Sequence, residues 1–565
     1  MAHFLEADLQ PWGAALANAL FAPDAAQQPT ALVGSAAAAS VVSSVARRDS
    51  AWRLLDELRP LHGAVDAVLC GWQGPLLEQL PLTPAEWQPA LIGARAIDGR
   101  LELSFCEAMA SCDAMPTVRG VHTLILRWSD AVQYLDDAAV AQRACTAVAS
   151  LSTLRTLEVG TAVSDAVAHS LAAALTRLTE LQALRLEWED DTIAVLARPL
   201  GLLTTLTRLD LSISEYEETA AVLAPALTCL SCLADLTLRC GDPGEVTVLA
   251  GPLGTLTTLT SLNLSDSGVD VDAYEGPEGV ECYHDAEALA LGLRHLSQLA
   301  ALNLRCAFDS PGGAAALAPA VSQLTALTVL DLVSDRILAD DAAALAPALS
   351  RLSRLAYLDL RSNTLGAAGA AALAPSLALL TALTSLQLGD NDVGANGAAS
   401  LARALSRLSR LADLDLSSNE LGAAGAAALA PSIALLTALT QLRLNRNDVG
   451  ANGAAALAPA LSRLSRLADL NLDSNAIGAA GAAALAPPFG CLTTLLYLGL
   501  SLNDIGDEGV QHLASALARL THLKRLRLGM NSVHDSAVDA LRARLPASVW
   551  EVTDLHRRRS RAAPS

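Results

Sequence analysis

Residues 411–419 read LADLDLSSN and residues 439–447 read LTQLRLNRN, two copies of one pattern that lie 28 residues apart. Alternation of apolar and polar residues in each copy is typical of a β-strand with one buried face. The Gly- and Ala-rich stretch that follows each Asn predicts a returning helix, which we expect at residues 426–436 in the first copy. The opening L-x-x-L-x-L recurs with the same spacing at eight leucines: Leu327, Leu355, Leu383, Leu411, Leu439, Leu467, Leu495 and Leu523.

The same pattern continues toward the N-terminus with less regular spacing. Strands are expected to open at Leu299, Leu259, Leu233, Leu206, Leu181, Leu154 and Val121. Residues 121–545 are therefore predicted to contain about fifteen units, each a strand followed by a helix. Because each unit packs only on its neighbours, we expect an α/β solenoid, a horseshoe with parallel strands on the concave face and helices on the convex face.

Sequence on either side of these units is less regular. Residues 61–120 are interpreted as degenerate repeats, with one strand expected at Leu101-x-Leu103. An array of repeats needs a cover on each exposed end. Residues 1–60 are therefore predicted to form a helical capping segment, and residues 546–565 a C-terminal cap with a basic tail, in which Trp550 seals the last layer.

Composition limits the classes of partner. A net charge of -21 opposes binding to nucleic acid and to anionic membrane surfaces, and it favours a basic protein partner. Neither a signal peptide nor an apolar span long enough for a membrane helix is present, so we expect a cytoplasmic monomer. The ten cysteines are scattered and are expected to be small buried apolar side chains without disulfides.

The complete unit, L-x-x-L-x-L-x-x-N-x-(L/I/V)-G-x-x-G-A-x-x-L-A, resembles the ribonuclease-inhibitor-like class of leucine-rich repeats. That class includes ribonuclease inhibitor, the repeat regions of NOD-like receptors and the GTPase-activating protein of Ran. The resemblance implies a leucine-rich repeat fold and a ladder in which each Asn amide binds the backbone of adjacent turns. A phosphate-binding G-x-x-x-x-G-K-[ST] segment is absent, so the nucleotide-binding module of NOD-like receptors is not expected.

Candidate partner-binding residues lie at strand exits and on the concave face. Three tryptophans each follow the last apolar strand position of a unit by two residues, and Trp beside charge is typical of binding hot spots. Packing of these side chains over the loops as local core is the alternative. The candidates are Trp72, Trp128, Asp130, Arg185, Glu187, Trp188, Glu189, Asp210, Arg239 and Arg305. Concave residues of the regular half are interpreted as a scaffold or secondary contact surface: Asp413, Asp415, Gln441, Arg443, Asp469 and Asn471.

No catalytic, cofactor-binding or metal-binding set is expected. Cys229-x-x-Cys232 lacks a second pair at the spacing of a zinc site, so structural thiols are favoured. The acidic insertion at residues 266–285 lacks the residue order of an EF-hand and is interpreted as a solvated loop that contacts a partner.

The sequence favours a non-enzymatic protein-interaction scaffold, with two alternatives. One is a Ran-type GTPase-activating protein, a family that presents an Arg from a repeat loop and carries an acidic tail, whereas the tail here is basic. The other is an F-box-like substrate adaptor, because residues 40–58 resemble the end of an F-box.

Overall fold

The computed structural model describes residues 100–104, 121–127, 138–160, 165–186, 195–213, 219–240, 244–265, 286–305, 312–546, 549 and 551–553. The chain divides into two compact units, Met1–Leu181 and Gln182–Ser565. The predicted capping segment 1–60, most of the degenerate repeats, the acidic insertion 266–285, Trp550 and the basic tail lie outside the described residues.

The first unit contains three parallel strands and two helices among its described residues. Strand β1 (Arg100–Ser104) pairs with β2 (Thr123–Arg127), which pairs with β3 (Thr156–Gly160). Helix α8 (Ala138–Ala149) follows β2, and α9 (Asp165–Leu175) follows β3. Leu101, Leu124 and Leu157 lie side by side in this register and are fully buried. The strand expected at Leu101 is therefore present.

The second unit repeats one strand and one helix. Each described strand pairs in parallel with the next along the chain. The strands are β4 (Ala183–Leu186), β5 (Arg208–Ile213), β6 (Asp235–Cys240), β7 (Ser261–Asn263), β8 (Ala301–Asn303), β9 (Val329–Asp331), β10 (Tyr357–Asp359), β11 (Ser385–Gln387), β12 (Asp413–Asp415), β13 (Gln441–Arg443), β14 (Asp469–Asn471), β15 (Tyr497–Gly499), β16 (Arg525–Arg527) and β17 (Glu551–Thr553).

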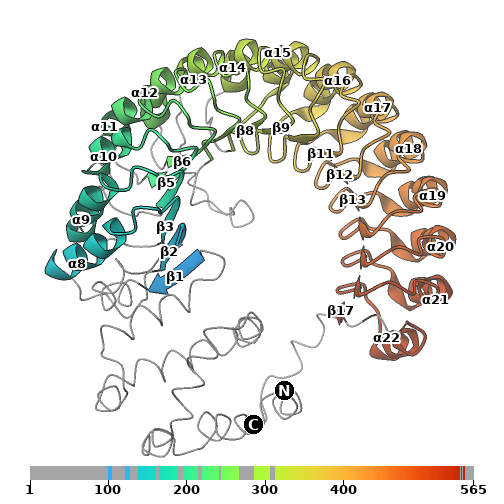
Figure 1. Ribbon diagram of the computed structural model, residues 1–565. Helices are drawn as coiled ribbons and strands as arrows, with labels where there is room; N and C mark the ends of the chain where they lie inside the picture. Colours follow the sequence, from blue (N-terminus) through green and yellow to red (C-terminus); the bar gives the residue numbers. More distant parts are fainter. Residues whose placement is uncertain are drawn as a thin grey trace, which may run out of the picture. The chain divides into compact units, whose positions relative to one another are not determined.

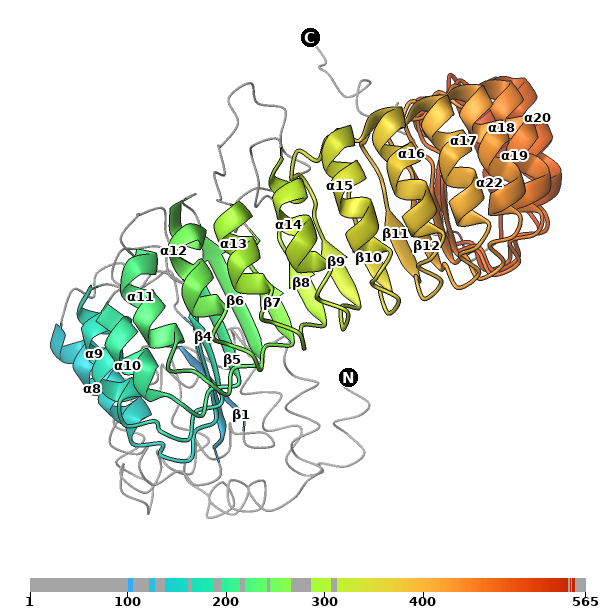
Figure 2. The same ribbon diagram turned by 90° about the horizontal axis from the view of Figure 1, so that it is seen from above.

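Helices of the second unit alternate with these strands. They are α10 (Ala197–Leu202), α11 (Thr219–Leu227), α12 (Gly244–Leu253), α13 (Ala286–Leu293), α14 (Gly313–Val321), α15 (Ala339–Leu349), α16 (Gly366–Leu377), α17 (Gly394–Leu405), α18 (Gly422–Ile433), α19 (Gly450–Leu461), α20 (Gly478–Phe489), α21 (Gly506–Leu517) and α22 (Asp535–Arg542). Within this unit the strands line the inner, concave side of a curved array and the helices cover the outer side (Figure 1). Seen from above, the helices lie parallel to one another (Figure 2). The predicted α/β solenoid is confirmed.

The core lies between the strand layer and the helix layer. In the repeat that opens at Leu411, Leu414 and Leu416 point inward from the strand and Leu429 meets them from the helix, and all four side chains are fully buried. Each buried leucine contributes roughly 1.5–3 kcal/mol. Because the same positions are buried in neighbouring repeats, the core is a continuous row of thin leucine layers.

A ladder of asparagine amides connects successive repeats, as the resemblance implied. Asn447 Nδ2 donates to Leu416 O at 2.7 Å in the preceding repeat and to Leu444 O at 3.1 Å in its own. Its Oδ1 accepts the Asn419 backbone N–H at 2.9 Å. Buried side chains at the same position donate to the preceding repeat throughout the ladder: Asn363, Asn391, Asn419, Asn447, Asn475, Asn503 and Asn531.

Helix boundaries differ from those predicted. In the repeat of Leu411 the helix is α18 (Gly422–Ile433), so it begins four residues earlier and ends three residues earlier than predicted. Gly422 has a φ of +60°, which lets the helix begin directly after the Asn turn. Pro431 lacks the N–H that a continuing helix needs, and the helix ends two residues beyond it.

Candidate interaction surface

Two columns of side chains run across the concave strand layer of the second unit, because alternate residues of each strand face away from the core. The first column is Ala183, Arg208, Asp235, Ser261, Ala301, Val329, Tyr357, Ser385, Asp413, Gln441, Asp469, Tyr497 and Arg525. The second column is Arg185, Asp210, Thr237, Asn263, Asn303, Asp331, Asp359, Gln387, Asp415, Arg443, Asn471, Gly499 and Arg527. Most of these side chains are half-buried, so the surface is both packed and accessible.

Carboxylates and amides of the second column also shape the strand exit. Asn303 Oδ1 accepts the Arg305 N–H at 3.0 Å, and Asp331 Oδ1 accepts the Val333 N–H at 3.1 Å. The side-chain oxygens of Asn263, Asp359, Asp415 and Asn471 make the same bond to the residue two positions on. Such a bond stabilises a turn, so Asp and Asn have a structural role in this column besides any contact with a partner.

A cluster of four polar side chains lies on β9 and β10 and at the exit of β10. Arg361 Nη2 forms an ion pair with Asp359 Oδ2 at 2.8 Å, and Tyr357 Oη donates to the same oxygen at 2.8 Å. Asp331 is the register neighbour of Asp359. Burial and the negative charge of Asp359 raise the pKa of Asp331 to about 6, and the nearby Arg305 and Arg361 lower it by less. We call Asp331, Tyr357, Asp359 and Arg361 the β9–β10 cluster.

A second charged group spans β11 to β14. Arg443 Nη1 lies 3.2 Å from Asp413 Oδ1, and Arg443 Nη2 donates to Gln441 Oε1 at 2.8 Å. Gln387 Nε2 donates to the other Asp413 oxygen at 2.9 Å. Burial raises the pKa of Asp413 and of Asp469, and the charge of Arg443 partly offsets it for both. These carboxylates are therefore partly desolvated on a surface that a partner can reach.

Farther along, an Arg joins β14 to β16. Arg527 Nη1 lies 2.9 Å from Asp473 Oδ2 and 3.3 Å from the hydroxyl of Tyr497. Burial raises the pKa of both Asp473 and Tyr497. The two tyrosines of the first column, Tyr357 and Tyr497, thus each lie beside an acid–arginine pair, a combination of aromatic and charged groups common at binding surfaces.

The structure describes four of the ten sequence-predicted partner-binding residues. It brings two of them together, because Arg185 Nε lies 3.5 Å from Asp210 Oδ2 across β4 and β5. Arg239 lies on β6 and Arg305 follows β8, so the whole of β7 separates them. The remaining candidates lie outside the described residues: Trp72, Trp128, Asp130, Glu187, Trp188 and Glu189.

The β9–β10 cluster was not singled out by the sequence. Tyr357 occupies a strand position that is Ser, Asp or Gln in the next three repeats, and that contrast is the signal that aligning the repeats supplies. The chemistry of the β9–β10 cluster depends on contacts between neighbouring strands, and the sequence of a single repeat does not reveal them.

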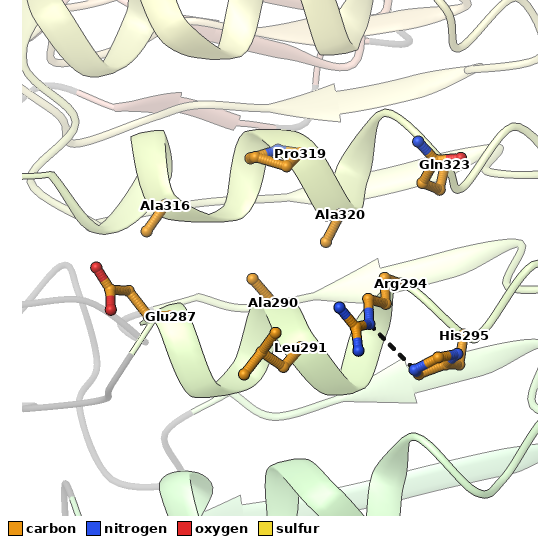
Figure 3. Close-up of a pocket in the computed structure, with 9 residues that line it drawn as sticks. All are labelled: Glu287, Ala290, Leu291, Arg294, His295, Ala316, Pro319, Ala320 and Gln323. Carbon is orange, nitrogen blue, oxygen red and sulfur yellow. Dashed lines mark hydrogen bonds between the residues drawn. The ribbon is translucent and has the colours of Figure 1, made fainter.

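A shallow groove of about 620 Å³ lies on the helical side, between α13 and α14. Glu287 lies at one end, whereas Arg294 and His295 lie at the other, with Arg294 Nε 3.1 Å from His295 Nε2 (Figure 3). Alanines and Pro319 line most of the space between. The acid and the bases are not brought together, so the groove does not form an acid–base pair.

Three cysteines depart from the expectation of burial. Cys145 is buried, but Cys229, Cys232 and Cys491 are exposed free thiols, because they lie in the segments that connect a helix to the next strand, outside the leucine layers. Within the described ranges, no group of three or more His, Cys, Asp or Glu side chains is arranged to bind a metal ion. Over the same ranges, no helix is long and apolar enough to span a membrane.

Comparison with known proteins identifies the repeats. Six segments match the family described as Leucine Rich repeat: residues 355–374, 380–402, 411–430, 436–458, 467–486 and 491–514. No curated protein matches the chain.

Three solved structures resemble the chain. A leucine-rich repeat protein of Leptospira interrogans is 17% identical with a TM-score of 0.43, over 81% of this chain and 96% of that one. An internalin of Listeria monocytogenes is 19% identical with a TM-score of 0.33, over 67% and 82%. TLR13 in a complex with ssRNA13 is 17% identical with a TM-score of 0.44, over 78% and 59%. The six matched segments are leucine-rich repeats, and the stacked strand–helix units of the second unit have the fold of a leucine-rich repeat solenoid.

Proposed function

We propose that this protein is a non-enzymatic interaction scaffold whose concave strand face binds a protein partner in the cytoplasm. The observation that supports this most is the concave surface from β4 to β16, most of whose side chains are polar and half-exposed, with a tyrosine and an acid–arginine pair at two places. Such a surface offers many polar and aromatic contacts, as expected for recognition of a protein.

The proposed partner is basic where it meets the concave face. Burial raises the pKa of Asp331, Asp413 and Asp469, so each carboxylate is held in a setting that disfavours its charge. An Arg or Lys side chain from a partner would relieve that cost through charge-assisted hydrogen bonds. The phosphates of a nucleic acid would meet the same carboxylates and be repelled, so nucleic acid is not proposed as the ligand.

The sequence-based expectations that extend this proposal are retained as part of it. We assign the ribonuclease-inhibitor-like class, the capping role of residues 1–60, degenerate repeats at 61–120, repeats at 121–545 and a C-terminal cap at 546–565 on the sequence pattern. Of the ten predicted partner-binding residues, Arg185 and Asp210 lie in the second column, and we retain the other eight as candidate partner contacts on the sequence pattern. Neither the Ran-type nor the F-box-like alternative is favoured by a contact among the described residues.

Quantitative affinity capture with chemical cross-linking tests the proposal. The full chain would be compared with a concave variant, Asp469→Arg combined with Tyr357→Ala, and with a convex control, Arg403→Glu on α17. Proteins captured by the wild type should remain with the control and be lost with the concave variant. An identical set of captured proteins for all three chains would overturn concave binding.

Folding of the variants needs a separate check. Asp469 and Tyr357 are half-buried, so circular dichroism and the melting temperature would establish that the concave variant retains its fold. If it does not, Asp469→Asn alone removes the charge at nearly constant volume and serves in its place.

A further inference from the structure

Exposed arginines mark one edge of the array, where each helix ends and the next strand begins. They occur in every second repeat, and none of their side chains has an ion pair or hydrogen bond to another described residue. The intervening repeats place Leu379, Leu435 and Cys491 at the corresponding exposed position. We call this the basic edge, formed by Arg351, Arg354, Arg407, Arg410, Arg463, Arg466 and Arg519.

Exposed acids mark the opposite edge, where each strand ends and the helix begins. Asp392, Asp448 and Asp504 each follow a ladder Asn directly, and the three share the 56-residue period of the arginines. None of these three carboxylates has an ion pair or hydrogen bond to another described side chain. Asp390 adds a second negative charge near Asp392, whereas Arg446 places a positive charge near Asp448. In the intervening repeats the same position is Glu420, also exposed, or one of the uncharged residues Thr364, Ala476 and Ser532. We call Asp392, Asp448 and Asp504 the acidic edge.

The parallel arrangement of the helices accounts for the sign of the charge at each edge. Every helix has its N-terminus at the acidic edge and its C-terminus at the basic edge, which favours acids at one and arginines at the other. This effect acts equally in every repeat, whereas the arginines occur in alternate repeats and so do the acids, apart from Glu420 on the repeat of β12. Asp392, Asp448 and Asp504 lie on the repeats of β11, β13 and β15, and the arginine rows precede β10, β12, β14 and β16. The two sets are therefore displaced by one repeat.

We propose that the basic edge of one molecule docks on the acidic edge of a second copy, displaced along the array by one repeat. With that displacement Asp392, Asp448 and Asp504 of one copy face the arginine rows at Arg407, Arg463 and Arg519 of the other. Without it the same carboxylates face Leu379, Leu435 and Cys491.

Geometry favours a second copy over an unrelated acidic partner. Two repeats span roughly 10 Å at the strand layer and roughly 16–20 Å at the helix layer, so the charged rows follow a curved line. Both edges belong to one array and therefore share this spacing and curvature. Only a partner with the same curvature keeps its charges aligned with all three charged rows of an edge. A second copy of this chain has that curvature because it has the same repeats.

The contact has a definite symmetry. It joins different surfaces of the two molecules, so each copy in a pair keeps one free edge and a third copy can add. This differs from the sequence-based expectation of a monomer. It also leaves the concave face open, and its failure would not affect the proposed binding of a partner there.

Sedimentation velocity of the full chain tests the proposal at about 0.1 M and about 1 M salt, since screening weakens exposed ion pairs. The wild type should form species beyond the dimer as concentration rises, and these should dissociate at high salt. A basic-edge variant (Arg407→Ala, Arg463→Ala and Arg519→Ala) and an acidic-edge variant (Asp392→Asn, Asp448→Asn and Asp504→Asn) should each raise the apparent Kd about tenfold or more. Arg198→Ala, an exposed Arg on α10 outside the repeats that carry the two edges, is the control and should associate as the wild type does.

Mixing the two variants is the decisive arm. Each retains one intact edge, so the mixture should form a 1:1 complex that stops at the dimer. A wild type that stays monomeric, edge variants that associate like the control, or a mixture that forms no complex would each overturn the proposal. Because the substituted side chains are exposed, melting temperatures within a few degrees of the wild type are expected.

Discussion

Early repeats of the second unit and the repeats of the asparagine ladder use different means to turn the chain. Strands β5 and β6 have six residues, whereas each strand from β9 to β16 has three. Where the strands are short, each ladder Asn binds the backbone of the preceding repeat. Among the early repeats, β5 and β6 have the longer strand pairing, whereas β7 and β8 also have three residues each. Compared with β5 and β6, the ladder repeats show that a short strand can be combined with one buried amide that bonds to the preceding repeat.

The ladder also stabilises a backbone that ordinary residues disfavour. Non-glycine residues with positive φ among the described residues all fall between Ser334 and Ser532, and most flank a ladder Asn, as Ser418 and Glu420 do. Each such residue costs roughly 1–2 kcal/mol. Several hydrogen bonds from one Asn offset that cost, so the turn does not require glycine at these positions.

Removing a ladder amide should have the largest effect. Asn447→Ala leaves the Leu416 and Leu444 carbonyls and the Asn419 N–H without their partner, and we expect a loss of about 3–5 kcal/mol in local stability. Hydrogen exchange of the repeats from Leu411 to Asn475 would measure it. The early-repeat control Asn303→Ala loses one bond to Arg305 N and should cost about 1 kcal/mol. Equal losses in the two variants would remove the distinction between the two regions.

A methyl group on a helix glycine should have an intermediate effect. At Gly453 an added Cβ would lie 2.7 Å from Val449 Cγ1 and 3.1 Å from Ala423 Cα of the preceding helix, so Gly453→Ala should cost about 1–3 kcal/mol. Gly251 on α12 has nothing within 4 Å of the same position, and Gly251→Ala should stabilise by up to about 1 kcal/mol. Thermal unfolding would compare the signs of the two changes, and destabilisation by both would contradict the open space found around Gly251.

The smallest effect concerns the strand where the two regions meet. Asn303 on β8 is the register neighbour of Asp331, so Asp331→Asn extends the early pattern by one repeat while an amide oxygen can still accept the Val333 N–H. Burial and Asp359 raise the pKa of Asp331 to about 6 from an ordinary value of 3.8. A raised pKa means that the folded protein binds the proton more tightly. Stability from this group is therefore complete below pH 4 and is lost as the pH rises through 6.

Asp331→Asn should remove that part of the pH dependence. Relative to the wild type, the variant should gain about 1–2 kcal/mol at pH 8, after allowance for the partial exposure of the carboxyl, and little below pH 4. Denaturant unfolding at both pH values would measure the difference. A variant that is less stable than the wild type at pH 8 would contradict the assigned cause.

The leucine and asparagine positions predicted the fold and the ladder, because a repeated core position must be filled the same way in each layer. The limits of α18 were missed because Gly422 and Pro431 act through backbone conformation rather than through the leucine pattern. The sequence indicated a concave face but not its chemistry. The raised pKa of Asp331 depends on Asp359 one repeat later, and only the strand register brings the two carboxylates together.

The ladder has a mechanical consequence. Its bonds run along the axis of the array, from each Asn to the repeat that lies 28 residues before it. A force that pulls the two ends apart therefore stretches these bonds in series, and the outermost layer gives way first. Each layer released adds 28 residues of extended chain, or roughly 90–100 Å. The protein would therefore lengthen under tension in equal steps, one repeat at a time.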